Sequence, residues 1–246
     1  MNSKREDYYP VVGYIIMFVA ISFLLWLLDI ATTFMGCNLG ISSPVSSEGL
    51  RWAMRNALPA LGRIPWAGVL LLVSSFGLLQ GAGVVRLFCR ITKLQRLTKM
   101  EIRSLLFSVG SILVYTIVVY LVTFSKWNIL LGITGTFENS SFLSGLPLII
   151  FLGIVIMTVV YGFMYGNYRS FIDVLESAGN AIKLFTPAIL ALIPAAAIIA
   201  MLEYAGVFKL LGLAEKETEI IAMVLYSIPF MHMILHKRGK LPVENA

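Results

Sequence analysis

Six apolar runs, each long enough to cross a lipid bilayer, constrain the fold of this chain more than any other feature. Each run holds about 18–23 residues, and a helix of ~20 residues with a rise of 1.5 Å per residue spans a hydrocarbon layer of ~30 Å. The runs do not alternate between apolar and polar residues as barrel strands would, and backbone polar groups in lipid must be satisfied inside a helix or a closed barrel. We therefore predict an all-α, polytopic integral membrane protein with about six transmembrane helices, at residues 11–32, 64–85, 104–124, 143–165, 184–204 and 219–236.

The composition agrees with a chain that folds in lipid. Hydrophobic residues make up 59% and charged residues 13% of the 246 positions, whereas soluble globular domains carry about 25% charged residues. No predicted span is followed by a large soluble domain, so residues 1–246 are interpreted as a single membrane domain.

Two connecting segments have the pattern of short amphipathic helices that lie at the membrane interface. In residues 47–58, apolar residues recur at three- and four-residue spacing, and Ser47 is placed to cap the helix. Trp52 and Trp66 are expected at the depth of the lipid head groups. Residues 167–179 show a similar pattern, and we predict a second short interfacial helix there.

The distribution of positive charge predicts the orientation. Of the nineteen lysines and arginines, thirteen fall on the side of the N-terminus, and six fall on the other side: Arg51, Arg55, Arg63, Lys126, Lys209 and Lys216. Lysine and arginine concentrate in cytoplasmic loops, so both termini are expected in the cytoplasm, with the chain in a bacterial cytoplasmic (inner) membrane. The net charge of +6 is then mainly a topology signal, and the expected partner is the lipid bilayer, not nucleic acid. The basic cluster from Arg86 to Arg103 is interpreted as a stop signal, with contact to anionic head groups as the alternative.

Two pairs of glycines have the spacing of helix-packing motifs. Gly77 and Gly81 form one GxxxG pattern, and Gly162 and Gly166 form another. Small residues let helix backbones approach closely in lipid, where no hydrophobic effect drives helices together. We predict that these glycines serve helix–helix contact, within the chain or in a dimer, more readily than ligand contact.

Two prolines lie on one face of the fifth run. Pro187 and Pro194 are seven residues apart, and each removes a backbone hydrogen bond to the carbonyl four residues earlier. Such helix breaks supply coordinating backbone atoms in secondary transporters. The surrounding alanines fit a plain packing face equally well, so the sequence leaves both interpretations open.

Polar side chains inside the predicted spans are few. The weak candidates for a polar pathway are Ser74, Ser75, Gln80 and Glu203. No Asp or Glu stands at the middle of a predicted span, although ionisable groups at that depth are the usual mark of a transport site. The sequence also lacks a recognisable catalytic set, metal-ligand pattern or phosphate-binding loop, so we expect no enzymatic activity, metal or cofactor.

Three further residues lie in the predicted connections. Cys37 and Cys89 fall on opposite sides of the membrane under this topology, so they are interpreted as two free thiols. Asn139 begins a short match to a glycosylation acceptor in an outer loop, and nothing else in the sequence supports that modification.

Two stretches resemble a known transporter family. The stretch "SSEGLRWAMRNALPALGRIPWAGVLLLVSSFGLLQGAGVVRLFCRI" resembles the early part of the AbgT family, the p-aminobenzoyl-glutamate transporters, in which an "EGL" segment leads into an amphipathic helix and a glycine-rich membrane helix. The stretch "LPLIIFLGIVIMTVVYGFMYGNYRSFIDVLESAGNAIKLFTPAILALIPAAAIIAMLEYAGVFKLLG" is similar to the later helix pair of that family. The likeness covers most of residues 9–212.

The resemblance implies a membrane transport protein for p-aminobenzoyl-glutamate or related aromatic amides. Family members are longer, however, and the re-entrant hairpins that hold their Ser-, Asn- and Asp-containing transport motifs have no counterpart here. No substrate-binding residue of the family can therefore be placed on this chain. The alternative is a non-transporting scaffold or partner subunit that dimerises, or that binds a separately encoded membrane protein.

Overall fold

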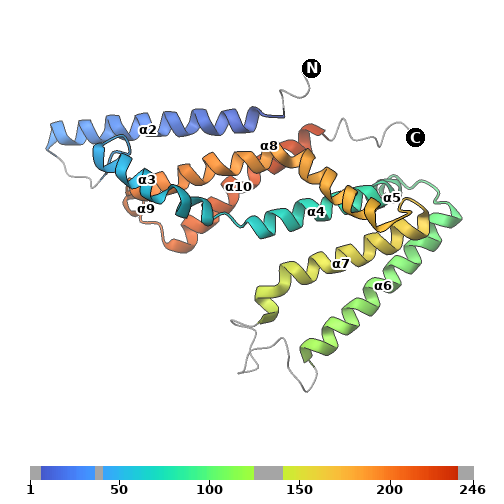
Figure 1. Ribbon diagram of the computed structural model, residues 1–246. Helices are drawn as coiled ribbons and strands as arrows, with labels where there is room; N and C mark the ends of the chain where they lie inside the picture. The colour runs from blue at the N-terminus through green and yellow to red at the C-terminus, as the bar shows by residue number, and fades with distance from the viewer. Residues whose placement is uncertain (1–6, 37–40, 125–140, 238–246) are drawn as a thin grey trace. The chain divides into compact units, whose positions relative to one another are not determined.

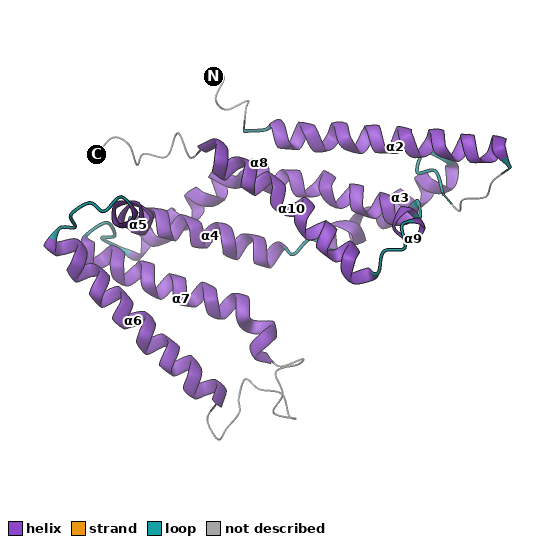
Figure 2. Ribbon diagram, turned by 180° about the vertical axis from the view of Figure 1, so that it is seen from behind, coloured by secondary structure: helices purple, strands orange, loops and turns teal. Residues whose placement is uncertain are grey.

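The computed structural model describes residues 7–36, 41–124 and 141–237, and throughout these ranges the regular structure is helical, without a strand (Figures 1 and 2). Five of the helices are long and apolar enough to cross a membrane one by one: α2 (Tyr9–Met35), α6 (Lys99–Phe124), α7 (Ser141–Tyr165), α8 (Phe171–Tyr204) and α10 (Glu215–Lys237). The prediction of an all-α, multi-pass membrane protein is confirmed. Cys37 and Asn139 lie outside the described residues.

The span predicted at residues 64–85 is divided in the structure. Helix α4 (Trp66–Ala82) has 17 residues, which is a length of roughly 25 Å. It is long and apolar enough to cross a membrane only together with α3 (Ser47–Gly62). Gly83 ends α4 because its φ of 84° lies in the left-handed region, and a separate helix, α5 (Val84–Thr92), follows. The hydrophobic run was visible in the sequence, but the turn at Gly83 was not predicted.

The separate interfacial helix predicted at residues 167–179 is also corrected by the structure. Helix α8 begins at Phe171 and continues to Tyr204, so this segment is the first part of a 34-residue helix. Asp173 caps the start, because its carboxylate accepts the backbone N–H of Ser170 at 3.0 Å. Gly179 does not adopt a left-handed conformation, so the helix continues through it.

The chain divides into two compact units. Unit 1 consists of residues 1–65 and 185–246, and unit 2 consists of residues 66–184. One boundary follows Pro65, and the other falls inside α8.

In unit 1, the second part of α8 forms the buried centre. Ala188, Ala191 and Ala195 have no exposed surface, and Tyr14 of α2 belongs to the same apolar cluster as the last two of these alanines. Small side chains let neighbouring helices approach the α8 backbone closely. The short helix α9 (Val207–Leu210) follows α8, and its Phe208 is buried.

The contact between α2 and α10 compensates for a proline. Pro229 lies inside α10 and has no N–H to donate to the carbonyl of Leu225, four residues earlier. The hydroxyl of Tyr14 donates a hydrogen bond to that same carbonyl at 2.7 Å. A polar group freed by the proline is thereby satisfied from a neighbouring helix, as a lipid environment requires.

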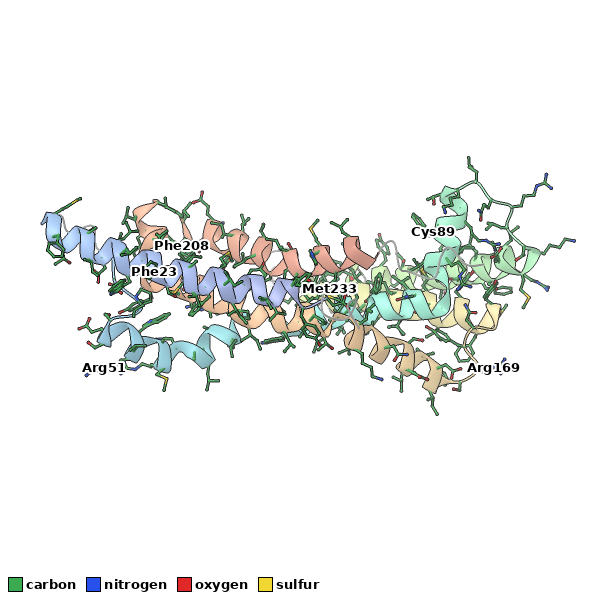
Figure 3. All side chains as sticks on the ribbon, turned by 90° about the horizontal axis from the view of Figure 1, so that it is seen from above. Phe23, Arg51, Cys89, Arg169, Phe208 and Met233 are labelled. Atoms are coloured by element: carbon green, nitrogen blue, oxygen red, sulfur yellow. The ribbon has the colours of Figure 1, made fainter. Side chains whose placement is uncertain are left out.

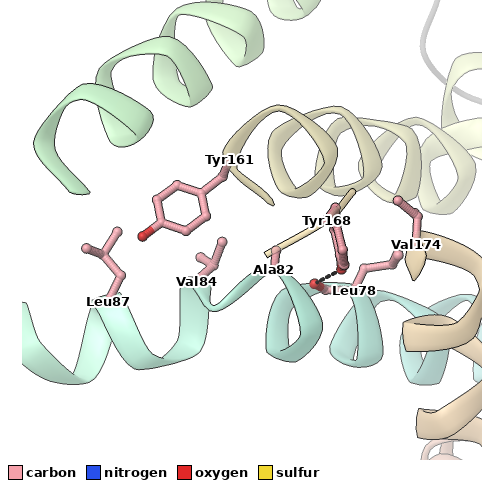
Figure 4. Close-up of a cluster of buried hydrophobic side chains, with 7 residues drawn as sticks. All are labelled: Leu78, Ala82, Val84, Leu87, Tyr161, Tyr168 and Val174. Carbon is pink, nitrogen blue, oxygen red and sulfur yellow. Dashed lines mark hydrogen bonds between the residues drawn. The ribbon is translucent and has the colours of Figure 1, made fainter. Parts of the chain in front are cut away.

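In unit 2, α7 packs against both α4 and α6. A cluster of buried side chains joins α4, α5, α7 and the start of α8 (Figure 4): Leu78, Ala82, Val84, Leu87, Tyr161, Tyr168 and Val174. Figure 4 shows Tyr168 directed at the backbone of Leu78, to whose carbonyl its hydroxyl donates a hydrogen bond of 3.0 Å.

A capping box and an ion pair close the turn between α5 and α6. Glu101 accepts the backbone N–H of Thr98 at 2.7 Å, and Thr98 Oγ1 accepts the backbone N–H of Glu101 at 3.3 Å. Arg90 of α5 donates to the other oxygen of the same carboxylate at 2.5 Å. Glu101 is 3% exposed, so its carboxylate is committed to these partners.

Candidate functional site

A cavity of about 730 Å³ in unit 1 is the strongest candidate for a binding site. It lies among α2, α3 and the second part of α8, and pockets for small molecules commonly have volumes of ~300–1,000 Å³. Among its lining residues, α2 contributes Phe18, Val19, Ser22, Phe23 and Trp26, the α3 segment contributes Leu50, Trp52, Ala53, Asn56 and Ala57, and α8 contributes Ile193, Ala197, Ala200 and Met201.

The start of α3 is fixed by its cap and by a glycine. Ser46, and not Ser47 as predicted, is the N-cap residue, and its hydroxyl accepts the backbone N–H of Gly49 at 3.0 Å. A Cβ atom at Gly49 would lie 2.5 Å from the carbonyl oxygens of Ser43 and Pro44. Only glycine therefore allows the preceding segment to fold so closely over the first turn of α3.

Farther along, α3 is attached to the C-terminal end of α8. The ring of Trp52 stacks on the ring of Tyr204, with 4.5 Å between ring centroids. Arg63, which follows α3, forms an ion pair with Glu203, and both side chains are partly exposed. Exposed ion pairs contribute at most about 1 kcal/mol, so the aromatic stack is the stronger of the two attachments.

The two faces of α3 differ in chemistry. Ala53, Asn56 and Ala57 line the cavity, whereas the exposed Arg51 and Arg55 are not among its lining residues. Figure 3 shows Phe23 of α2 on the side of α2 that faces α3, and Arg51 on the opposite side of α3. Helix α3 therefore lines the cavity with uncharged side chains and directs its arginines away from it.

The Ser22 hydroxyl and the Asn56 side-chain amide group in the cavity are engaged locally. The hydroxyl of Ser22 donates to the carbonyl of Phe18 at 2.8 Å and approaches the sulfur of Met201 at 3.0 Å. Asn56 Nδ2 donates to the carbonyl of Trp52 at 3.0 Å. Within the described part of the chain, none of the lining residues is charged. The cavity is thus suited to an apolar or aromatic group.

A smaller cavity of about 350 Å³ lies between α2 and α10. Tyr9, Tyr14 and Met17 line it from α2, and Ile228 and His232 line it from α10. Over the described ranges, no group of three or more His, Cys, Asp or Glu residues could hold a metal ion, and His232 stands in no such group.

The structure places Gly77 and Gly81 of α4 against the first part of α8. A Cβ atom at Gly77 would lie 2.5 Å from the carbonyl oxygen of Ser177 and 2.6 Å from the Cβ atom of Ala181. At Gly81 it would lie 2.2 Å from the hydroxyl of Ser177. Both glycines therefore permit close backbone approach within one chain.

The second glycine pair has a different environment. At Gly162, a Cβ atom would lie 2.2 Å from the ring of Tyr168, whereas a Cβ atom at Gly166 would meet no other part of the chain within 4 Å, and Gly166 adopts φ of 89°. Tyr168 thus packs over Gly162 while its hydroxyl reaches α4. Burial raises the pKa of Tyr168, so the hydroxyl remains a donor well above neutral pH. Tyr168 was not among the predicted site residues, although an aromatic residue just after a GxxxG pattern was a visible signal.

The helix-break and pathway candidates are divided between the two units. Helix α8 continues through both Pro187 and Pro194. Ser75 of α4 is buried and donates to the carbonyl of Leu71 in its own helix, at 2.7 Å. Its neighbours Ser74 and Gln80 are half-buried on α4 in unit 2, whereas Glu203 is paired with Arg63 in unit 1. None of these residues lines the larger cavity.

The cavity was not predicted because no local sequence pattern indicates it. Three segments that are far apart in the sequence line it. The sequence of each segment alone has only the pattern of a membrane helix or of an interfacial helix. No protein-family model matches the chain, and no curated protein or solved structure shows significant similarity to it.

Proposed function

We propose that this chain is an AbgT-like membrane transport protein of shortened form, in the bacterial cytoplasmic membrane with both termini in the cytoplasm. Its proposed substrates are p-aminobenzoyl-glutamate or related aromatic amides. The observation that carries the proposal is the cavity of about 730 Å³, because the lining residues from Leu50 to Leu61 belong to the stretch resembling the family.

The lining of the cavity suits the aromatic part of such a substrate. Phe18, Phe23, Trp26 and Trp52 offer rings against which a benzoyl group can stack, at a typical value of ~0.5–1.5 kcal/mol per aromatic pair. The carboxylates of the glutamate part need a cation. Arg63 is the nearest cation in sequence to the lining residue Leu61, and we assign it this role by exchange of its ion pair with Glu203.

The alternative function is a dimerising scaffold or a partner subunit without transport of its own. The local engagement of the cavity's polar donors favours it, because a transporter site usually presents polar groups free to meet the substrate. In that case the glycine-packed helices of unit 2 provide a rigid membrane framework, and a separate protein or a second copy completes the system.

Uptake by the purified chain in liposomes distinguishes the two functions. We expect labelled p-aminobenzoyl-glutamate to accumulate under a proton or sodium gradient, above the level of empty liposomes. Ala57→Phe fills the cavity and should abolish uptake, whereas Ala67→Phe, at an exposed position of α4, should leave it unchanged. Absence of uptake from folded wild-type protein would instead favour the scaffold.

A further inference from the structure

The apolar face of α5 extends beyond the protein that covers it. Val84, Leu87, Phe88 and Ile91 share one face of the helix by their three- and four-residue spacing. The first two are buried in the cluster of unit 2, whereas Phe88 is 66% and Ile91 is 41% exposed. Two of the four apolar side chains on this face thus pack on protein, and the other two are exposed.

The second residue after α5, which follows the C-cap Lys93, is a leucine at a position where glycine is favoured. Leu94 adopts φ of 52° and ends the helix in a Schellman motif: its N–H donates to the carbonyl of Ile91, and that of Gln95 donates to the carbonyl of Arg90, each at 3.0 Å. A left-handed conformation strains a leucine. The side chain is nevertheless 93% exposed, so contacts within the chain do not offset this strain.

Five cations lie in the same segment of the chain, on α5, in the turn after it and at the start of α6: Arg86, Lys93, Arg96, Lys99 and Arg103. All five are exposed, and within the part of the chain that the structure describes none of them forms an ion pair. The nearby acid, Glu101, is buried and committed to Arg90 and Thr98. The surface therefore carries positive charge that the protein itself does not neutralise.

We propose that α5 and the turn at residues 93–99 form a docking surface for the anionic head groups of membrane phospholipids. Lys93, Arg96 and Lys99 contact the phosphates, and Phe88 and Leu94 insert at the boundary between head groups and acyl chains. Such a combination of basic and bulky apolar residues is typical of helices that bind anionic membranes. Along the chain, the surface directly precedes α6, a helix long and apolar enough to cross a membrane, so head groups are within its reach in this proposal.

This occupant explains both unusual features at once. Insertion into lipid stabilises the exposed leucine and offsets the strain at its backbone, and anionic head groups neutralise the unpaired cations. A stop signal for topology would need the charges but not the apolar side chain at position 94.

The test measures lipid binding to the purified full-length chain in neutral detergent. Native mass spectrometry would follow titrations with phosphatidylglycerol, phosphatidylcholine and inorganic phosphate. We expect phosphatidylglycerol to bind more tightly than phosphatidylcholine, and inorganic phosphate not to compete at millimolar concentration. The triple variant Lys93→Gln, Arg96→Gln, Lys99→Gln should lose phosphatidylglycerol affinity on the order of 100-fold, since each cation near an anionic surface contributes roughly five-fold.

A matched variant removes the same charge elsewhere. Arg51, Lys209 and Lys216 are exposed, and changing all three to Gln should alter phosphatidylglycerol affinity by less than about three-fold. Equal losses in both triple variants, or equal binding of the two lipids to the wild type, would overturn the proposal.

Leu94→Gly separates lipid binding from folding. Glycine relieves the left-handed backbone, so the melting temperature in lipid-free detergent should not fall. Phosphatidylglycerol affinity should fall by roughly ten-fold, because the inserted side chain is lost. Leu94→Phe should retain the affinity. Unchanged affinity in Leu94→Gly would contradict insertion at this position.

Discussion

Helices α3 and α5 are both short and amphipathic, but they differ in how many contacts with the rest of the chain hold them in place. Helix α3 is capped by Ser46, stacked through Trp52 on Tyr204 and followed by the Arg63–Glu203 ion pair. The second half of α5 has exposed apolar side chains, and the turn after the helix contains a leucine in a strained conformation. The position of α3 is thus determined by contacts within the chain, whereas the end of α5 is completed by its surroundings.

This difference has a practical consequence for measurements in detergent. Changes in α3 should alter the free energy of unfolding of the protein itself. Changes at the exposed end of α5 should leave that free energy unchanged or improve it, and should act mainly on lipid binding. Four substitutions, in order of decreasing effect, test this contrast.

Gly49→Leu should give the largest loss. A Cβ atom at Gly49 would lie 2.5 Å from two backbone oxygens, which cannot move as a flexible side chain could. We expect the free energy of unfolding in detergent to fall by about 3 kcal/mol. Gly62→Leu is the control, because nothing lies within 4 Å of a Cβ atom there. Equal stability of the two variants would show that protein contacts do not hold α3 in place.

Glu101→Ala tests the one part of the α5 region that is held by protein. The variant loses a buried carboxylate that binds Arg90 and caps α6, and we expect a loss of about 2 kcal/mol, less than for a fully buried pair because Arg90 is 38% exposed. Glu217→Ala removes an exposed cap of α10 and should cost less than 1 kcal/mol. Denaturant titration in detergent compares the two. If the losses are equal, burial and the ion pair add nothing.

Leu94→Gly should increase stability in lipid-free detergent. Relief of the left-handed leucine is worth up to about 1 kcal/mol. Leu106→Gly, at an exposed position inside α6, should instead reduce stability by about 1 kcal/mol, because glycine is unfavourable within a helix. Thermal unfolding of both variants gives the comparison, and destabilisation by Leu94→Gly would mean that the leucine contacts protein.

Arg63→Gln should have the smallest effect. Its ion pair with Glu203 is partly exposed, so we expect less than about 1 kcal/mol, decreasing as salt is added. Arg55→Gln, at an exposed position on α3, should change stability by even less. A large, salt-independent loss in Arg63→Gln would assign the ion pair a leading role in holding α3.

The sequence predicted what depends on local pattern and missed what depends on backbone detail or distant contacts. The length of the apolar runs was sufficient to predict the membrane helices. The serine pair before Glu48 placed the predicted N-cap of α3 within one residue of Ser46. The left-handed turns at Gly83 and Leu94 were missed, because hydrogen bonds at helix ends determine them. The continuation of α8 past Gly179 was missed because glycine in a helical pattern signals an end only when it adopts positive φ.

The candidate site was less predictable than the fold. The glycines at 77 and 81 could be selected from their spacing, but their neighbours Ser177 and Ala181 lie about a hundred residues away along the chain. The larger cavity requires α2, α3 and α8 together, and its lining is ordinary membrane-helix sequence. Only the placement of these segments in space distinguishes the lining from lipid-facing residues.

Substrate binding tests the proposed transport function most directly. Isothermal titration calorimetry of the detergent-solubilised chain with p-aminobenzoyl-glutamate would compare the wild type with Ala57→Phe and with the control Ala67→Phe. We expect saturable binding to the wild type and the control, and its loss when Ala57 is replaced and the cavity is filled. Binding that persists in Ala57→Phe, or no binding to folded wild-type protein, would contradict a substrate site in this cavity.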